Sequence, residues 1–259
     1  MEANNTPNPI FVVGCPSSGN TLLWSLLEAH PHISCGNETD FLVQCRSIVE
    51  GAYWDKLQEY GFDKAYWHER IAELFNTFKT DYAEKHGKQR WADKTPSYTP
   101  HIDFLHTLFP GCQIIHIIRD GRDVVMSYRR RWGYKSALKA IFIWRKYIQM
   151  AQAYGATMPA GQYMEVRYED LAQQPEVAAK AIFEFLGEEW DPNLLQLDQS
   201  SSYQKNTQYK NLVEDRRQKD EKKSLIFRSS IGTGKKLDPL MKGLLYFWNR
   251  QLLKELKYF

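Results

Sequence analysis

Short apolar runs alternate with longer amphipathic segments along this chain of 259 residues. Runs rich in β-branched side chains predict buried strands at residues 10–13, 113–118 and 163–166, with a shorter strand-like piece at 90–92. Apolar residues at helical intervals predict helices at 64–85, 136–154 and 175–186. This order of strands and helices predicts an α/β fold in three layers. One parallel sheet lies between helices, and ligands bind beyond the carboxyl ends of its strands.

Weaker patterns fill the intervals between these elements. Further helices are expected at 40–49, 103–109, 124–132 and 239–257, and a polar, turn-rich link at 31–39. Residues 198–223 are polar and charged with little apolar content. We therefore expect a single domain over 1–259, with a flexible tail at 1–9 and a mobile surface loop at 198–227.

Composition narrows the class of protein. Hydrophobic residues make up 43% and charged residues 25%, which is typical of a globular chain. A net charge of +3 is too small to indicate a nucleic-acid partner and better fits a small polyanionic ligand. The four cysteines lack metal-ligand spacing, and the chain shows no apolar leader or membrane-spanning run. These features predict a soluble cytoplasmic protein without a membrane span.

The first strand runs into a small, polar, glycine-containing turn, IFVVGCPSSGNT, and then into a helix. The spacing from Gly14 to Thr21 matches the phosphate-binding Walker A loop except that Asn20 replaces its lysine. Backbone N–H groups and the start of the helix can hold an anion without that lysine, but metal-assisted hydrolysis of a nucleoside triphosphate fits poorly. The alternative is an ordinary strand–turn–helix. Six residues form the expected cradle: Pro16, Ser17, Ser18, Gly19, Asn20 and Thr21.

A second strand–loop–helix unit, QIIHIIRDGRDVVMSYRRRW, repeats this arrangement. Arg119 can bind a phosphate with two N–H groups, and Ser127 lies eight residues later on the following helix. Arg131 lies one helical turn beyond Ser127 and can face the same anion. Salt bridges from Arg119 to Asp120 or Asp123, and a solvated Arg131, are the structural alternatives. Two such loops on one sheet predict a ligand with two separated anionic groups.

Together these motifs resemble the sulfotransferases that use 3′-phosphoadenosine 5′-phosphosulfate (PAPS). PSSGNT is similar to their 5′-phosphosulfate loop, and IIRDGRDVVMSYRRR to their 3′-phosphate motif. HPHISCGNET, DKTP, RYEDL and the basic loop RSSIGTGKK also resemble the tyrosylprotein sulfotransferase branch. The resemblance covers most of the chain to about Leu186 and then that last loop. One departure stands out, because the family usually carries a basic residue where this chain has Ser17.

The resemblance implies a P-loop fold, PAPS as co-substrate, adenosine 3′,5′-bisphosphate (PAP) as product, an acceptor bearing a hydroxyl group, and no metal. It implies Glu38 as the general base, which works best when burial raises its pKa toward neutral. Lys94, expected in a turn, is the cation that would stabilise the charge developing on the leaving group. Glu38 as a capping residue and Lys94 as a surface lysine are the alternatives. His30 and His32 are rival bases, although His30 at a helix end suits a capping role.

The nucleotide would extend to two further segments. Tyr168, in RYEDL, would pack against adenine or donate to a phosphate, unless it is only a tyrosine buried at a strand end. A closing loop is expected to bring four residues to the nucleotide: Arg228, Ser230, Gly232 and Lys235.

Two other functions fit parts of the pattern. One is a metal-dependent P-loop kinase, which the missing lysine disfavours. The other is a PAP-binding module that has lost catalysis, which Ser17 would suit. The sequence does not indicate which hydroxyl compound is the acceptor, nor the oligomeric state.

Overall fold

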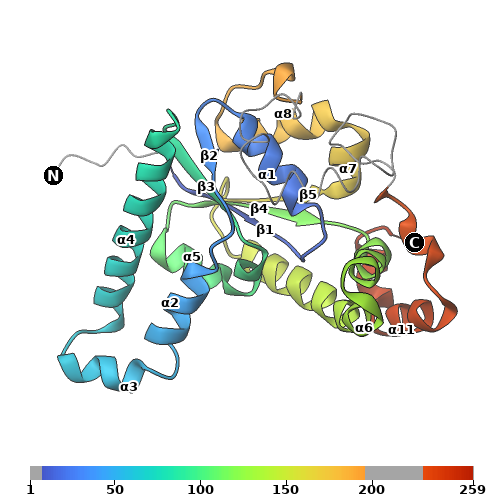
Figure 1. Ribbon diagram of the computed structural model, residues 1–259, viewed down its shortest axis with the longest axis horizontal. Helices are drawn as coiled ribbons and strands as arrows, with labels where there is room; N and C mark the ends of the chain where they lie inside the picture. Colours follow the sequence, from blue (N-terminus) through green and yellow to red (C-terminus); the bar gives the residue numbers. More distant parts are fainter. Residues whose placement is uncertain (1–7, 196–229, 259) are drawn as a thin grey trace.

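A five-stranded parallel sheet organises the protein (Figure 1). The computed structural model describes residues 8–195 and 230–258, so the expected loop at 198–227 lies wholly outside the described residues, as does the tail up to residue 7. The strand order is β2-β3-β1-β4-β5. The strands are β1 Ile10–Val13, β2 Ile33–Cys35, β3 Arg90–Lys94, β4 Gln113–Ile118 and β5 Tyr163–Arg167. The predicted parallel sheet is therefore confirmed.

Helices follow or precede each strand and cover the sheet. They are α1 Asn20–Ala29, α2 Phe41–Val49, α3 Trp54–Leu57, α4 Lys64–Lys85, α5 Ile102–Leu108, α6 Gly121–Gly155, α7 Tyr168–Gln173, α8 Pro175–Leu186 and α11 Pro239–Glu255. Short 3-10 turns are η1 Gln58–Tyr60, η2 Pro96–His101, η3 Pro192–Leu195 and η6 Thr233–Lys236. Gly187 ends α8 in the left-handed conformation, as its position in the sequence predicts.

The two faces of the sheet carry different helices. In β1, Ile10 and Val12 face α1, α7 and α8, whereas Phe11 faces the layer of α2, α4 and α5. Strands β1, β2 and β3 are buried at every residue, because helices cover both faces of the sheet. Figure 1 shows the resulting three layers, with the sheet between the two groups of helices.

A third apolar cluster lies beside the sheet, where α11 packs along α6 (Figure 1). Trp144 of α6 is fully buried there, and its indole N–H donates to the Arg119 carbonyl at 2.9 Å. This bond ties the middle of α6 to the loop that follows β4. The C-terminal helix therefore supports the same edge of the sheet as the two phosphate-type loops.

Two expectations about the elements were wrong. The link at 31–39 contains strand β2, which pairs only with β3 at the edge of the sheet. Strand β3 runs to Lys94, so this lysine ends a strand and does not lie in a turn. The two helices expected at 124–132 and 136–154 are confirmed, because they lie on either side of a kink at Gly133, with φ 81°, within the element labelled α6.

Candidate active site

The loop after β1 is fixed by close backbone contacts. Gly14 has φ 152°, and a Cβ atom there would lie 2.5 Å from the Ile117 carbonyl oxygen. Gly19 has φ 105°, and its Cβ would lie 2.4 Å from Cδ2 of Tyr168. The Gly14 N–H donates to Oγ1 of Thr99 at 2.8 Å. Only glycine fits both positions, so the loop is held close to β4 and to the start of α7.

Asn20 has a structural task within this loop. Its Nδ2 donates to the Cys15 carbonyl at 2.9 Å, and the Ser18 N–H donates to the same oxygen at 3.0 Å. Asn20 therefore closes the loop on itself, whereas a Walker lysine would reach out to a phosphate.

The start of α1 remains available to an anion. Gly19 provides no side-chain cap at the start of α1, and its carbonyl accepts only from the N–H groups of Leu22 and Leu23 among the described residues. Ser17 has φ 72°, and its buried hydroxyl has no hydrogen-bond partner among the described residues. Pro16 and Thr21 flank the loop and are half-buried. A phosphate group fits this set of donors, because buried polar atoms normally have a partner.

Arg119 joins three predicted parts of the site. Its terminal nitrogens donate to the Ser17 carbonyl, at 3.0 Å, and to the Ser230 carbonyl. Its Cζ lies 4.4 Å from the centre of the Tyr168 ring. The side chain is buried, and its Nε has no partner among residues 8–195 and 230–258. The alternative salt bridge is long, with 3.9 Å between Arg119 and Asp123. Arg119 thus lies between the first loop, α7 and the last loop.

Asp123, considered from the sequence only as a salt-bridge partner of Arg119, anchors the last loop. Its carboxylate accepts from the N–H groups of Gly232, at 2.8 Å, and Gly234, at 2.6 Å, and from the Thr233 hydroxyl. These bonds hold the last loop on the start of α6. The signal available in the sequence was a second aspartate in RDGRD, opposite a loop with two glycines.

The remaining predicted nucleotide residues lie in different environments. Ser127 is buried on α6. Arg131 is exposed one turn later, and its Cζ lies 5.8 Å from the centre of the Trp132 ring. Lys235 is exposed within η6. Arg228 lies outside the described residues.

The two predicted catalytic residues contact each other directly. Lys94, at the carboxyl end of β3, forms an ion pair with Glu38 from the segment between β2 and α2. The Lys94 side chain is nearly buried, whereas that of Glu38 is 48% exposed. The burial that the sequence argument required of Glu38 is not present in this structure, so an acceptor would have to supply it.

A buried ion pair lies next to Lys94 in β3, at Asp93. Asp93 accepts from Lys79 of α4 at 3.0 Å and from the Thr95 hydroxyl at 2.6 Å. Lys79 was not among the expected site residues. A signal was nevertheless present in the sequence, because Lys79 lies four residues from both Phe75 and Ala83 on the buried stripe of α4.

His30 has a capping role at the opposite end of α1 from the loop. Its ring nitrogens lie 3.1 Å from the Glu189 carbonyl and 3.2 Å from the His32 backbone N–H, and its ring stacks on Phe183. The backbone N–H of His30 donates to the Leu27 carbonyl at the end of α1, so His30 takes the expected C-cap position, whereas its ring bonds to residues outside the helix.

Comparison with known proteins decides the family. A family model described as the sulfotransferase family matches residues 9–192. The chain belongs to the sulfotransferase family.

Relatives of this sulfotransferase agree with that assignment. Protein-tyrosine sulfotransferase A of Caenorhabditis elegans is 28% identical over 209 residues, which cover 76% of this chain and 54% of that protein. The chain thus spans about half the length of this curated relative.

Two solved structures show the same fold. The sulfotransferase domain from the Synechococcus PCC 7002 olefin synthase has a TM-score of 0.67 at 23% identity, covering 95% of this chain and 97% of that one. Mouse sulfotransferase SULT7A1, solved in complex with PAP, has a TM-score of 0.50 at 17% identity. The match covers 96% of this chain and 88% of that one.

Two further observations bear on the expected properties of this sulfotransferase. The four cysteines are free thiols, and burial raises the pKa of Cys15, Cys35 and Cys112. None of the helices within residues 8–195 and 230–258 combines the length and apolar character that crossing a membrane requires.

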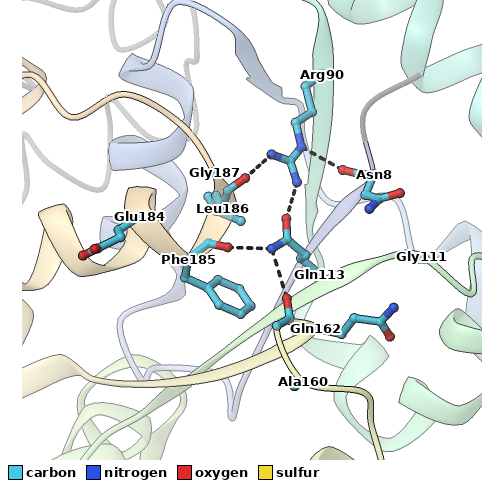
Figure 2. Close-up of a pocket in the computed structure, with 11 residues that line it drawn as sticks. Asn8, Arg90, Gly111, Gln113, Ala160, Gln162, Glu184, Phe185, Leu186 and Gly187 are labelled. Carbon is cyan, nitrogen blue, oxygen red and sulfur yellow. Dashed lines mark hydrogen bonds between the residues drawn. The ribbon is translucent and has the colours of Figure 1, made fainter. Parts of the chain in front are cut away.

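A cavity of about 500 Å³ lies at the other end of the sheet (Figure 2). Arg90 and Gln113, the first residues of β3 and β4, line it together with Gln162, just before β5. Ligands of parallel sheets bind at the carboxyl ends of the strands, so this cavity does not belong to the candidate active site.

Proposed function

We propose that this chain transfers a sulfuryl group from PAPS to a hydroxyl group of an acceptor and releases PAP. One observation carries the proposal. Arg119 bonds to the first loop and to the last loop and stacks on Tyr168, so the residues proposed for both ends of the nucleotide form one connected site. Membership of the sulfotransferase family supports the reaction class.

The two anionic ends of PAPS would bind different donors. The loop at 14–19 and the start of α1 would hold the 5′-phosphosulfate, where the Ser17 hydroxyl lacks a partner. Arg119 would offer its unpaired Nε to the 3′-phosphate, together with Ser127. Tyr168 would contact the adenine. Ser230, Gly232 and Lys235 would close over the nucleotide with Arg228.

The ion pair of Glu38 and Lys94 would perform the chemistry. The acceptor oxygen forms a bond to sulfur as the bond between sulfur and the bridging phosphate oxygen breaks, and Glu38 takes the hydroxyl proton. Lys94 would move its ammonium from Glu38 to the bridging oxygen as negative charge develops there. Lys94 therefore also replaces the positive charge that is missing at Ser17.

The acceptor is proposed to carry a phenolic hydroxyl. The relative named protein-tyrosine sulfotransferase A makes a tyrosine side chain of a peptide the first acceptor to test. A cytoplasmic location and catalysis without a metal belong to the same proposal. The kinase alternative is disfavoured, because Asn20 closes the loop and leaves no side-chain cation at the Walker position.

Labelled PAPS and tyrosine-containing peptides, followed by a wider panel of phenols and alcohols, test the reaction. Glu38→Gln should lower transfer by about 100-fold or more while leaving the Kd for PAP nearly unchanged. Glu69→Gln, which alters an exposed carboxylate on α4, is the matched control and should transfer normally. Unchanged turnover in Glu38→Gln would exclude Glu38 as the base.

Ligand-induced stabilisation separates the competing functions. PAP should raise the Tm of the protein, and ATP with Mg²⁺ should not. The reverse result would favour the kinase. Tight PAP binding with no labelled product from any acceptor would favour the inactive binding module.

A further inference from the structure

Two histidines and a glutamate from separate segments converge near the amino-terminal edge of the sheet. His30 ends α1, His32 precedes β2, and Glu188 follows α8. Oε2 of Glu188 lies 3.3 Å from Nδ1 of His32 and 4.0 Å from Nδ1 of His30. Within the part of the chain that the structure describes, one potential ligand atom from each residue lies within 4.8 Å of the other two.

Surrounding groups orient these atoms as metal ligands are usually oriented. The other ring nitrogen of His30 lies 3.1 Å from the Glu189 carbonyl, which fixes this nitrogen as the donor and makes Nδ1 the acceptor of the His32 backbone N–H at 3.2 Å. The ring is also stacked on Phe183, with 4.9 Å between centroids. An outer hydrogen bond from the second ring nitrogen to a carbonyl is the common arrangement for a histidine that binds a metal.

Glu188 is held in the same way. Its Oε1 accepts from Arg90 at 3.0 Å, which leaves Oε2 to face the histidines. Arg90 is in turn fixed by the carbonyls of Asn8 and Leu186 and by Gln113, as Figure 2 shows. The carboxylate therefore has one oxygen assigned to the protein and one available to a cation.

We propose that Nδ1 of His30, Nδ1 of His32 and Oε2 of Glu188 bind one Zn²⁺ ion. Two imidazoles and a carboxylate are a usual ligand set for zinc. Two atoms that bind the same Zn²⁺ ion in a tetrahedron lie about 3.3 Å apart. Nδ1 of His32 and Oε2 of Glu188 already have this spacing, at 3.3 Å. Nδ1 of His30 lies 4.0 Å from Oε2 of Glu188 and must move slightly closer. The His32 side chain is 50% exposed, which leaves the fourth position open to water. The ion replaces the weak 3.2 Å contact from the His32 N–H to Nδ1 of His30.

The proposed ion has a structural role and is independent of the proposed transfer reaction. Helix α1 has 10 residues and separates the cluster from the phosphate-type loop by about 15 Å. The ion would join the turn between α1 and β2 to the segment after α8, which are distant in the sequence. Because the unfolded chain lacks this arrangement, binding would stabilise the fold.

Calorimetric titration of the full chain, without a polyhistidine tag, with ZnCl₂ tests the site. We expect one ion per chain, and a Tm higher by about 5–10 °C when free Zn²⁺ exceeds its Kd by a factor of about 100. Co²⁺ provides a second probe, since its visible absorption reports a tetrahedral site of this ligand set. Absence of saturable binding at one equivalent would overturn the proposal.

Variants assign the binding to these residues. His32→Ala and Glu188→Gln should each weaken Zn²⁺ binding at least about tenfold. His86→Ala removes an exposed histidine that is not part of this cluster and should bind Zn²⁺ normally. Equal affinity in His32→Ala and the unaltered chain would overturn the proposal.

Weaker Zn²⁺ binding in the His32 variants should reflect the lost ligand and not a loss of folding. His32 is exposed, and His32→Gln keeps a polar side chain there, so the Tm without metal should stay unchanged in both variants at this position. His30 is buried and is therefore unsuited to the test.

Discussion

Lys79 and Asp93 form an ion pair that is closed to solvent, with 3.0 Å between Nζ and Oδ2. The side chains are 2% and 0% exposed. Asp93 also binds the Thr95 hydroxyl, so the residues on both sides of Lys94 are tied together. The pair thus fixes the end of β3 from which Lys94 reaches Glu38.

Removing the charge of Lys79 should destabilise the fold. Lys79→Met leaves Asp93 buried without its partner and should lower the free energy of unfolding by about 3–5 kcal/mol. Urea denaturation measures this change. Lys79→Met combined with Asp93→Asn should recover part of the loss, whereas Lys85→Met, on the exposed side of α4, should change little. Equal stability of the Lys79→Met protein and the unaltered chain would contradict a tightly coupled pair.

Replacing Arg119 should weaken nucleotide binding. Arg119→Lys keeps the charge but loses the planar group that bonds Ser17 and Ser230 and stacks on Tyr168. The Kd for PAP, measured by calorimetry, should rise at least about tenfold. Arg130→Lys alters an exposed arginine on α6 and serves as the control. An unchanged Kd in Arg119→Lys would remove Arg119 from the proposed nucleotide site.

Because Gly19 lies against the Tyr168 ring, adding one methyl group at this position should strongly lower the stability of the fold. In Gly19→Ala the new Cβ adds a steric clash with the ring to the strain of a positive φ, and should cost about 2–4 kcal/mol of stability. Gly87→Ala shares the positive φ but meets no atom within 4 Å, so it should cost only about 1–2 kcal/mol. Thermal unfolding of both variants separates strain from clash, and equal losses would show that the clash is absent.

Stability should fall in mild acid because of buried His116. Burial is the main cause that lowers its pKa below the ordinary 6.5, and Glu165 acts in the opposite direction. Below pH 6.5 the unfolded chain therefore binds a proton that the folded chain does not. The stabilisation is complete above pH 6.5 and declines as the pH falls below it, by up to about 1.4 kcal/mol per pH unit.

Urea denaturation between pH 5.5 and 7.5 measures this slope. His116→Gln should reduce the slope, and His86→Gln, which changes an exposed histidine, should not. Identical slopes in all three proteins would show that His116 does not titrate with folding.

Local patterns were sufficient for most of the fold. Continuous apolar runs indicated the buried strands, and helical spacing gave the bounds of α4 correctly, because both signals depend on neighbours within a few residues. The same applies to the two loops, since their glycines and Arg119 lie at fixed distances from strand ends. The sequence by itself therefore determined a parallel α/β sheet with phosphate-type loops at the carboxyl ends of its strands.

Tertiary structure decided which residues meet. Strand β2 is only three residues long and is defined by its pairing with β3. Asp123 reaches Gly232 across 109 positions, and Lys94 reaches Glu38 across 56. No local pattern encodes such contacts, because they depend on how the helices pack on the sheet. The same packing left Glu38 half exposed, buried Lys79 and brought His30 and His32 to Glu188.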